Sequence, residues 1–295
     1  MVNLVKKVIA NQTYYYLVHT IRKDNKIEKI ERYIGKRLPE NIEEIKKKFS
    51  SEIYEEKWYK LFNKIKKSHF NEFNGMPRIS REKEMGSFMI KFTYDTQRIE
   101  GSKLTLRETA DLLEKGVSPR SKSINDIKEA EAHKKIFYEI LKYKKDISLH
   151  LILHLHKELF QNTKSEIAGK IRQHQVAISG SKFMPPYSAE VYPLLMEFFK
   201  WYNKYKDKLH PVELSALVHL KFVTIHPFAD GNGRISRILM NLILNRYSYP
   251  LSDIHYEDRT SYYNALERSQ INKIESIFLN WFSKRYIKEH KQYLK

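Results

Sequence analysis

HPFADGNGRISR, residues 226–237, determines how the C-terminal half of this chain folds. Apolar side chains recur every three or four positions on both sides of it. This spacing predicts a buried helix over 211–225 and another that begins near Gly233. Pro227 cannot continue a helix, and the glycines allow a tight turn. The stretch is therefore predicted to be a loop between two core helices.

This loop has the residue types of an anion-binding site. The first turn of the second helix has unpaired N–H groups, which attract negative charge together with the helix dipole. A neutral imidazole such as that of His226 can take a proton from a hydroxyl near neutral pH. A carboxylate such as that of Asp230 is a ligand that Mg²⁺ accepts beside phosphates.

The other polar residues of the loop extend this interpretation. The backbone of Gly231 and Gly233, together with Asn232, can donate hydrogen bonds to a phosphoryl oxygen. Arg234 and Arg237 are three residues apart, so they share one helix face, and guanidinium groups bind phosphate oxygens. The simpler interpretation is a corner between two helices, with a capping acid and solvated arginines. The complete ordered string favours a nucleotide site over that corner.

HPFADGNGR followed by Arg237 resembles the active-site motif of the Fic (Fido) family, HPFx[DE]GNGRxxR, with every fixed position present. The resemblance implies a mainly α fold, in which a Fic-type helical core carries a β-hairpin flap. It also implies an enzyme, a protein adenylyltransferase that uses Mg²⁺ and transfers AMP from ATP to a hydroxyl side chain of a target protein. By this resemblance His226 is the catalytic base and Asp230 holds the metal ion. The nucleotide and its phosphates are expected to bind Gly231, Asn232, Gly233, Arg234, Arg237, Tyr262 and Tyr263.

A second segment, TQRIEGSKLTL at 96–106, resembles the inhibitory helix motif [ST]xxxE[GN] of the same family, with Thr96, Glu100 and Gly101 in place. The resemblance implies a helix over about 88–101 whose Glu100 enters the phosphate site. A carboxylate there could pair with Arg237 through two hydrogen bonds and inhibit the enzyme within one molecule. Removal of AMP from a target, with Glu100 positioning a water, is a further expected activity. The alternative is a surface glutamate near a helix end.

AGKIRQHQVAISGSKFMPP, residues 168–186, resembles the flap of the family, a β-hairpin that holds the target segment by main-chain pairing. The flap itself is expected over about 172–187. Val176 and Ile178 alternate with Ala177 and precede Ser179-Gly180, which is typical of a short strand and a turn. Such pairing would place few demands on the sequence of the target. An ordinary surface hairpin is the alternative.

The whole chain is predicted to have four parts. Residues 1–37 form a basic N-terminal β-hairpin that turns at 24–25, and 38–83 form a charged helical connector. The Fic domain then covers 84–285, and 286–295 form a C-terminal tail.

The composition of the chain indicates which kinds of site it can form and in which cellular compartment it is expected. The 295 residues include no cysteine, which excludes disulfides and thiolate metal sites. No leader and no apolar run long enough to span a bilayer is visible, so a cytoplasmic protein without membrane contact is expected. His150 and His154 lie four residues apart, as in some metal sites, but no acid or cysteine nearby completes a set, so a structural role is expected.

The net charge of +19 attracts ATP, acidic proteins and nucleic acid alike. Expected partners are ATP, an unidentified protein target, the chain itself as a modified substrate, and a second copy, because members of the family often dimerise. The alternative function is a nucleic-acid- or protein-binding regulator that uses the Fic fold as a nucleotide sensor, with the basic residues 1–37 as its binding surface. The intact His226 favours the enzyme, since a sensor does not need a base.

Overall fold

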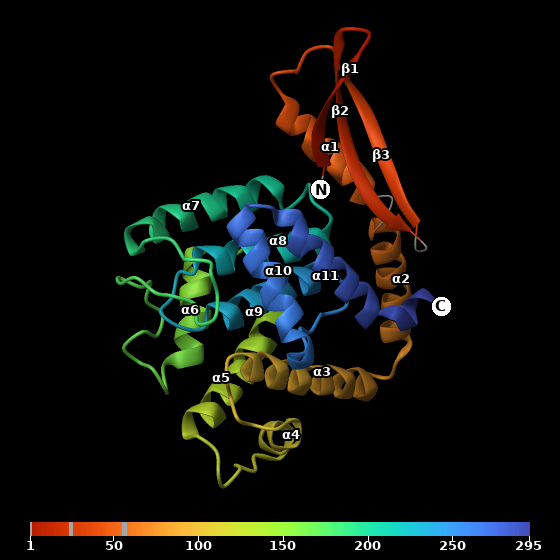
Figure 1. Ribbon diagram of the computed structural model, residues 1–295. Helices are drawn as coiled ribbons and strands as arrows, with labels where there is room; N and C mark the ends of the chain where they lie inside the picture. Colours follow the sequence, from red (N-terminus) through yellow and green to blue (C-terminus); the bar gives the residue numbers. More distant parts are fainter. Residues whose placement is uncertain (1, 24–25, 55–57) are drawn as a thin grey trace. The chain divides into compact units, whose positions relative to one another are not determined.

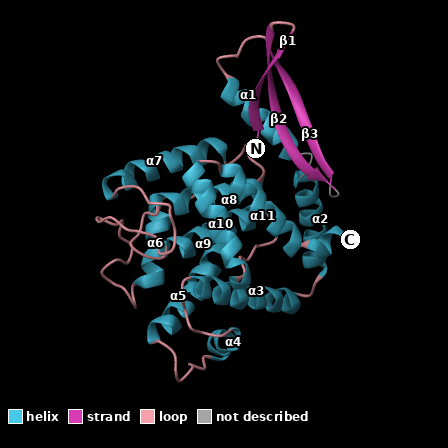
Figure 2. Cartoon of the chain, in the orientation of Figure 1, coloured by secondary structure: helices cyan, strands magenta, loops and turns pink. Residues whose placement is uncertain are grey.

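The computed structural model describes residues 2–23, 26–54 and 58–295. The chain folds into two compact units, residues 1–63 and residues 64–295. Helices dominate the second unit (Figure 1), and the described strands all belong to one antiparallel sheet in the first unit (Figure 2). The prediction of a mainly α fold with an N-terminal β appendage is confirmed.

The sheet of the first unit has three strands in the order β1-β2-β3: β1 (Val2–Ile9), β2 (Gln12–Lys23) and β3 (Lys26–Gly35). The predicted hairpin is β2–β3, whose turn at 24–25 lies outside the described residues. The additional strand β1 turns into β2 at Ala10 and Asn11, both with positive φ, as a tight hairpin turn requires. This turn was missed because it contains neither glycine nor proline.

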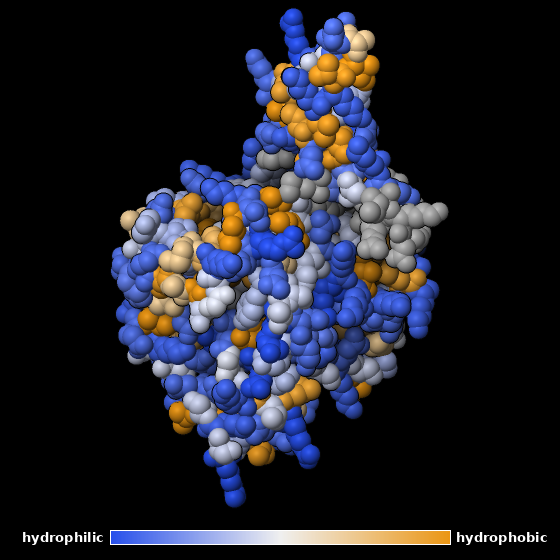
Figure 3. All heavy atoms as spheres, viewed as in Figure 1, coloured by the Kyte–Doolittle hydropathy of each residue, from blue (hydrophilic) through white to orange (hydrophobic). Residues whose placement is uncertain are grey.

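One face of this sheet forms a small core with α1 (Ile42–Tyr54). Leu17 is fully buried together with Phe49 and Ile53, and partly buried aliphatic side chains of β1 and β3 surround them. Successive side chains of a strand point to opposite faces, so Tyr14 and Tyr16 lie on the face away from Leu17. Figure 3 shows that the surface of this unit mixes apolar and strongly hydrophilic side chains.

The second unit is built around α8 (Pro211–Ile225) and α9 (Asn232–Arg246), whose residues are buried on nearly all sides. Helices that are apolar all round belong to the centre of a core. Both were predicted, and α9 begins one residue before Gly233. The surrounding helices are α3 (Arg78–Ile99), α4 (Leu106–Lys115), α5 (Ile124–Lys142), α6 (Leu149–Phe160), α7 (Ser188–Tyr205), α10 (Arg259–Asn272) and α11 (Glu275–Glu289), with 3₁₀ turns η2 (Tyr256–Asp258) and η3 (Lys291–Leu294).

The predicted boundaries near residues 84 and 286 fall inside the helices α3 and α11. Helix α2 (Lys60–Gly75) is followed almost at once by α3, because Pro77 breaks the helix for only two residues. The last ten residues are not a free tail, since α11 continues to Glu289 and both Tyr286 and Tyr293 are buried. The division of the chain into four parts therefore stays a prediction. The contacts within the structure divide the chain into two compact units.

The flap segment has the predicted turn but no strand. Gly180 has φ 75° and Ser181 donates its N–H to the Ile178 carbonyl at 3.0 Å, which confirms the turn. Within 168–187, however, the structure has no strand ladder, so the prediction of a hairpin is wrong for this segment. Two prolines, Pro185 and Pro186, provide no N–H for pairing, and the Gln175 amide donates to the Pro185 carbonyl instead.

In the ranges that the structure describes, none of the helices combines the length and the hydrophobicity that crossing a membrane requires.

Candidate active site

His226 lies at the C-terminal end of α8, in a left-handed conformation with φ 53° and ψ 57°. This uncommon backbone turns the chain out of the helix and is typical of functional positions. Nδ1 lies 3.2 Å from the Val223 carbonyl, so Nδ1 carries the proton and Nε2 keeps a lone pair. Burial lowers the pKa of His226 and the charge of Arg172 lowers it further, although the Val223 carbonyl acts in the opposite direction. The ring is therefore neutral at pH 7.

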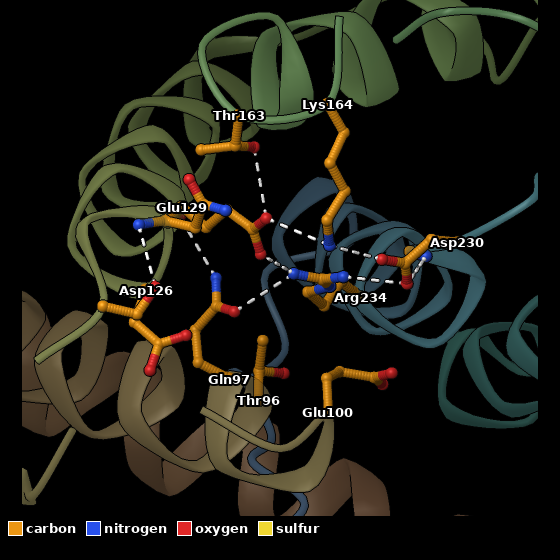
Figure 4. Close-up of polar contacts among 12 residues, drawn as sticks. Thr96, Gln97, Glu100, Asp126, Glu129, Thr163, Lys164, Asp230 and Arg234 are labelled. Atoms are coloured by element: carbon orange, nitrogen blue, oxygen red, sulfur yellow. Dashed lines mark hydrogen bonds and ion pairs between the residues drawn. The ribbon is translucent and has the colours of Figure 1, made fainter. Parts of the chain in front are cut away.

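The carboxylate of Asp230 is bound from three sides just before α9 (Figure 4). Its Oδ2 lies 2.6 Å from Nζ of Lys164, and its Oδ1 accepts from Nη2 of Arg234 at 3.0 Å and from the Gly231 N–H at 2.5 Å. Burial would raise the pKa of Asp230, but Arg234 and Lys164 outweigh it and hold the pKa at about 2. The group is charged throughout the physiological range, as a cation ligand must be.

Arg234 is only 3% exposed and links this carboxylate to α5 and α3. Nη1 forms an ion pair with the buried Glu129 and lies 3.3 Å from Oε1 of Gln97. Glu129 in turn lies 3.3 Å from Nζ of Lys164, so acids and bases alternate around the group (Figure 4). Arg234 was predicted to bind phosphate; here both of its terminal nitrogens bind carboxylates, and it positions Asp230.

The Gly-Asn-Gly turn has little freedom to change shape. Gly231 has φ 80°, and a Cβ there would lie 2.4 Å from the ring of Phe160, so only glycine fits. The buried Asn232 accepts from the Phe228 N–H at 2.9 Å and donates to the Phe228 carbonyl at 2.8 Å. Its amide, predicted to face a phosphoryl oxygen, instead closes the loop. The N–H groups at the start of α9 remain the donors that suit an anion.

Arg237, one turn into α9, is 1% exposed and is enclosed by α3 and α10. Nε donates to Oγ1 of Thr96 at 2.6 Å, and Nη1 donates to the Tyr262 hydroxyl at 3.4 Å. Nη2 lies 2.6 Å from Oε1 of Glu100 and 3.3 Å from the Thr96 carbonyl. Burial would lower the pKa of Arg237, but the charge of Glu100 outweighs it and raises the pKa. The predicted Glu100–Arg237 contact is present, through one oxygen rather than two.

Glu100 lies over the first turn of α9. It caps the end of α3, where Gly101 with φ 100° reverses the chain. A Cβ on Gly233 would come within 2.4 Å of Oε1 of Glu100, which shows how closely the carboxylate covers that turn. Figure 4 shows Glu100 on the end of α3 with Thr96 and Gln97 beside it. A carboxylate therefore occupies the space above Gly233 that an anion at this helix end would need.

The two tyrosines of α10 have different environments. Tyr262 is buried, its hydroxyl lies 3.0 Å from Nε2 of His219, and burial raises the pKa of Tyr262. Tyr263 is exposed and donates to the Ile99 carbonyl at 3.0 Å. Tyr262 thus supports Arg237 from inside the core, while Tyr263 is the tyrosine that a nucleotide could reach.

Sequence reasoning missed Arg172, which fastens the flap segment to the loop. The side chain is buried and donates only to carbonyls: Nε to His226 at 2.8 Å, Nη1 to His174 at 3.0 Å and Nη2 to Pro186 at 2.6 Å. The Arg172 N–H also donates to the Pro227 carbonyl at 3.0 Å. Both ends of the flap segment are therefore joined to the turn that carries His226.

The tip of the flap segment is held by α10. Glu267 accepts from the Ser181 hydroxyl at 2.8 Å and from the Lys182 N–H at 2.7 Å. Val176 and Ile178, the predicted target-pairing residues, lie between these anchors and are half-buried. The segment is held at its base and its tip without a strand ladder between them.

His156 was also missed as a residue of this site. Its ring is fully buried and stacks on Phe228, with 3.7 Å between the ring centres. Nε2 donates to the Asp230 carbonyl at 3.0 Å, and Nδ1 accepts from the Gly169 N–H at 2.9 Å. Burial lowers the pKa of His156 to about 4, so the neutral ring is a fixed support for the loop. His156 lies among the leucines of α6, and nothing in the sequence near it indicates that it supports the loop at Asp230.

Comparison with known proteins agrees with this geometry. Residues 146–244, which include the loop and α8, match the model of the Fic/DOC family. A relative from Drosophila melanogaster, named protein adenylyltransferase Fic, is 36% identical over 204 residues, which are 68% of this chain and 40% of the relative. The chain thus spans less than half the length of the relatives that it matches.

Solved structures show the same fold. A Fic domain containing signaling protein from Bacteroides thetaiotaomicron superimposes with a TM-score of 0.71 at 27% identity, over 80% of this chain and 95% of that one. Fic-1 from C. elegans superimposes with a TM-score of 0.69 at 26% identity, over 86% of this chain and 76% of that one.

Proposed function

We propose that this chain, which belongs to the Fic/DOC family, transfers AMP from ATP to a hydroxyl side chain of a protein and is inhibited by its own Glu100. One observation carries the proposal: the carboxylate of Glu100 is paired with Arg237 above the glycine turn that begins α9. An anionic side chain at a helix N-terminus with a buried guanidinium occupies a site suited to phosphate.

His226 is the proposed base. Its Nε2 lone pair can take the proton of the target hydroxyl while the hydroxyl oxygen bonds to the α-phosphorus of ATP. The bond from that phosphorus to the bridging oxygen breaks, and pyrophosphate leaves. The backbone N–H groups of Gly231, Asn232 and Gly233 are the proposed donors to the charge that builds on the phosphoryl oxygens. Arg237 is the proposed partner of the outer phosphates once Glu100 has moved.

Asp230 fits a Mg²⁺ ion of the kind that bridges phosphates through one carboxylate and waters. Its low pKa and its place next to the α9 N-terminus support this assignment. Oδ2 is bound by Lys164, so the ammonium group would have to yield to the ion or turn toward the phosphates. When bound, Mg²⁺ would neutralise charge on the phosphates.

The flap segment is the proposed binding surface for the target protein. An extended segment offers main-chain groups to a passing peptide and demands little of its sequence. Val176 and Ile178 lie in that segment, and Arg172 holds it next to the carbonyl of His226. The target hydroxyl would then approach His226 from the flap side.

A specific observation favours a second function, binding of single-stranded nucleic acid by the sheet of the first unit. Tyr33 is 52% exposed, and its ring lies 5.3 Å from that of Tyr16 and 6.2 Å from that of Tyr14. Lys7 lies over Tyr16 and Lys36 over Tyr14. Aromatic rings on which bases can stack, with lysines close enough to neutralise phosphates, are typical of single-stranded nucleic-acid sites.

We expect Glu100→Gly to raise labelling by α-³²P-ATP at least tenfold, because the substitution frees Arg237. His226→Ala in the same background should abolish the labelling, because no base remains. Glu40→Gly removes an exposed glutamate of the first unit and serves as the matched control. Equal labelling of the parent and Glu100→Gly would disprove inhibition by Glu100, and labelling that survives His226→Ala would disprove the role of the base.

The pH dependence of labelling by Glu100→Gly should report the base. Burial lowers the pKa of His226 below its ordinary value of 6.5, so the neutral form persists as the pH falls toward 6.5. The rate should stay constant from pH 7.5 to about 6.5 and decrease only below that. An acid limb centred above pH 7 would contradict a buried, neutral base.

For the second function, we expect the parent to shift a single-stranded oligonucleotide in a native gel, more weakly as salt increases. The double substitution Tyr14→Ala and Tyr16→Ala should weaken binding about tenfold or more, because stacking contributes about 1–3 kcal/mol per base. Tyr187→Ala, at an exposed position of the second unit, is the control. Unchanged binding by the double variant would exclude the sheet as the surface.

A further inference from the structure

A second polar cluster lies where α3 meets the segment that leads from α9 to η2. It consists of Asp95 in α3, and of Asp253 and His255 in the segment that leads from α9 to η2. One ligand atom from each of the three side chains lies within 4.8 Å of the other two. We propose that these residues bind a divalent transition metal ion such as Zn²⁺ or Mn²⁺.

The two carboxylates are buried without the donors that a charged group needs. Asp253 is 2% exposed, and neither of its side-chain oxygens accepts a hydrogen bond from an N–H or O–H group in the described part of the chain. Asp95 is 1% exposed; its Oδ1 accepts from the Tyr256 N–H at 2.8 Å, and its Oδ2 has no such donor among the described residues. Buried carboxylates in native proteins are normally paired or bound to a metal.

The neighbouring cations are already engaged. Arg285 forms an ion pair with Asp258 and reaches only the carbonyl of Asp253. Glu289 adds a further acid, since one of its oxygens accepts from the Asp253 N–H at 2.9 Å. Among the described residues, no lysine or arginine forms an ion pair with the carboxylate of Asp95 or Asp253, although the protein as a whole is strongly basic.

The donor set suits a transition metal rather than calcium. Two carboxylate oxygens and one imidazole nitrogen are ligands of Zn²⁺ and Mn²⁺, whereas Ca²⁺ takes six to eight oxygens. His255 is half-buried, and a neutral imidazole is the commonest side-chain ligand of such ions. Its Nε2 lies 3.9 Å from Oδ2 of Asp253 and 3.0 Å from Nζ of Lys91. An ion would displace that exposed ammonium group.

Metal binding here would fix the position of α3. Asp95 is adjacent to Thr96, whose hydroxyl and carbonyl both accept from Arg237. An ion held by Asp95 and Asp253 would join the last turns of α3 to the segment before η2. This consequence follows from the positions of the residues and does not depend on the proposed transfer of AMP.

The competing explanation is a proton shared between the carboxyl groups of Asp95 and Asp253. Such a proton would also relieve the repulsion between them, and it needs no ion. The two explanations differ in one respect that can be measured, because only the metal site binds Zn²⁺ or Mn²⁺ through Asp253.

The test is titration of the full chain with ZnCl₂ and with MnCl₂ by isothermal calorimetry, without nucleotide. Asp253→Asn and His255→Gln should each weaken binding about 100-fold or more, because each removes a ligand. Two controls remove other possible ligands: Glu40→Gln, at an exposed position of the first unit, and His154→Gln, whose ring lies 2.8 Å from Glu139 and stacks with His150. Both controls should bind as the parent does.

Thermal unfolding separates loss of the site from loss of the fold. Asp253→Asn should melt no lower than the parent without metal, because an amide can donate to Asp95. Zn²⁺ or Mn²⁺ should then raise the melting temperature of the parent but not that of Asp253→Asn. Failure of the parent to bind either ion would overturn the proposal and support the shared proton. Binding that survives Asp253→Asn, or that disappears only in the controls, would also overturn it.

Discussion

The burial of one guanidinium group constrains most of this structure. Arg237 is almost fully enclosed, and a buried charge is costly unless its N–H groups all find acceptors. The acceptors are Thr96 of α3, Glu100 directly after α3, and Tyr262 of α10, so both helices must converge on α9. Of these partners, only Glu100 combines a full charge with partial exposure to solvent. The same contact that completes the core is therefore the one that a triphosphate could replace.

A second set of alternating charges positions the loop at 226–237. Glu129, Arg234, Asp230 and Lys164 come from three separate segments and neutralise one another around the start of α9. These contacts hold Asp230 and Arg234 in place before any ligand arrives, although Lys164 would have to leave Asp230 if Mg²⁺ bound there. His156 supports the same loop from α6 through a neutral ring. These contacts hold the loop without any contribution from Glu100, which is the group that we propose gives way to ATP.

The sequence was informative wherever the signal was local. The spacing of apolar residues predicted the helices on both sides of 226–237, and Pro227 and the glycines predicted the loop between them. The two motifs predicted that Glu100 contacts Arg237. Arg172, His156 and Glu129 were not predicted, because each acts on atoms distant in sequence and lies in a segment without a motif. The inward-facing amide of Asn232 was also missed, since spacing does not show which way a side chain turns. The flap segment forms no strands, because Pro185 and Pro186 have no N–H group to pair with the alternating residues 176–178.

The central claim is that Glu100 competes with the phosphates of ATP for Arg237. Its most direct test is the affinity of the chain for Mg·ATP, measured by calorimetry for the parent and for Glu100→Gly. The account predicts that the variant binds at least about tenfold more tightly, because a charge-assisted hydrogen bond contributes about 1.5–3 kcal/mol. Equal affinities would contradict it, since they would mean that Glu100 does not occupy the phosphate site.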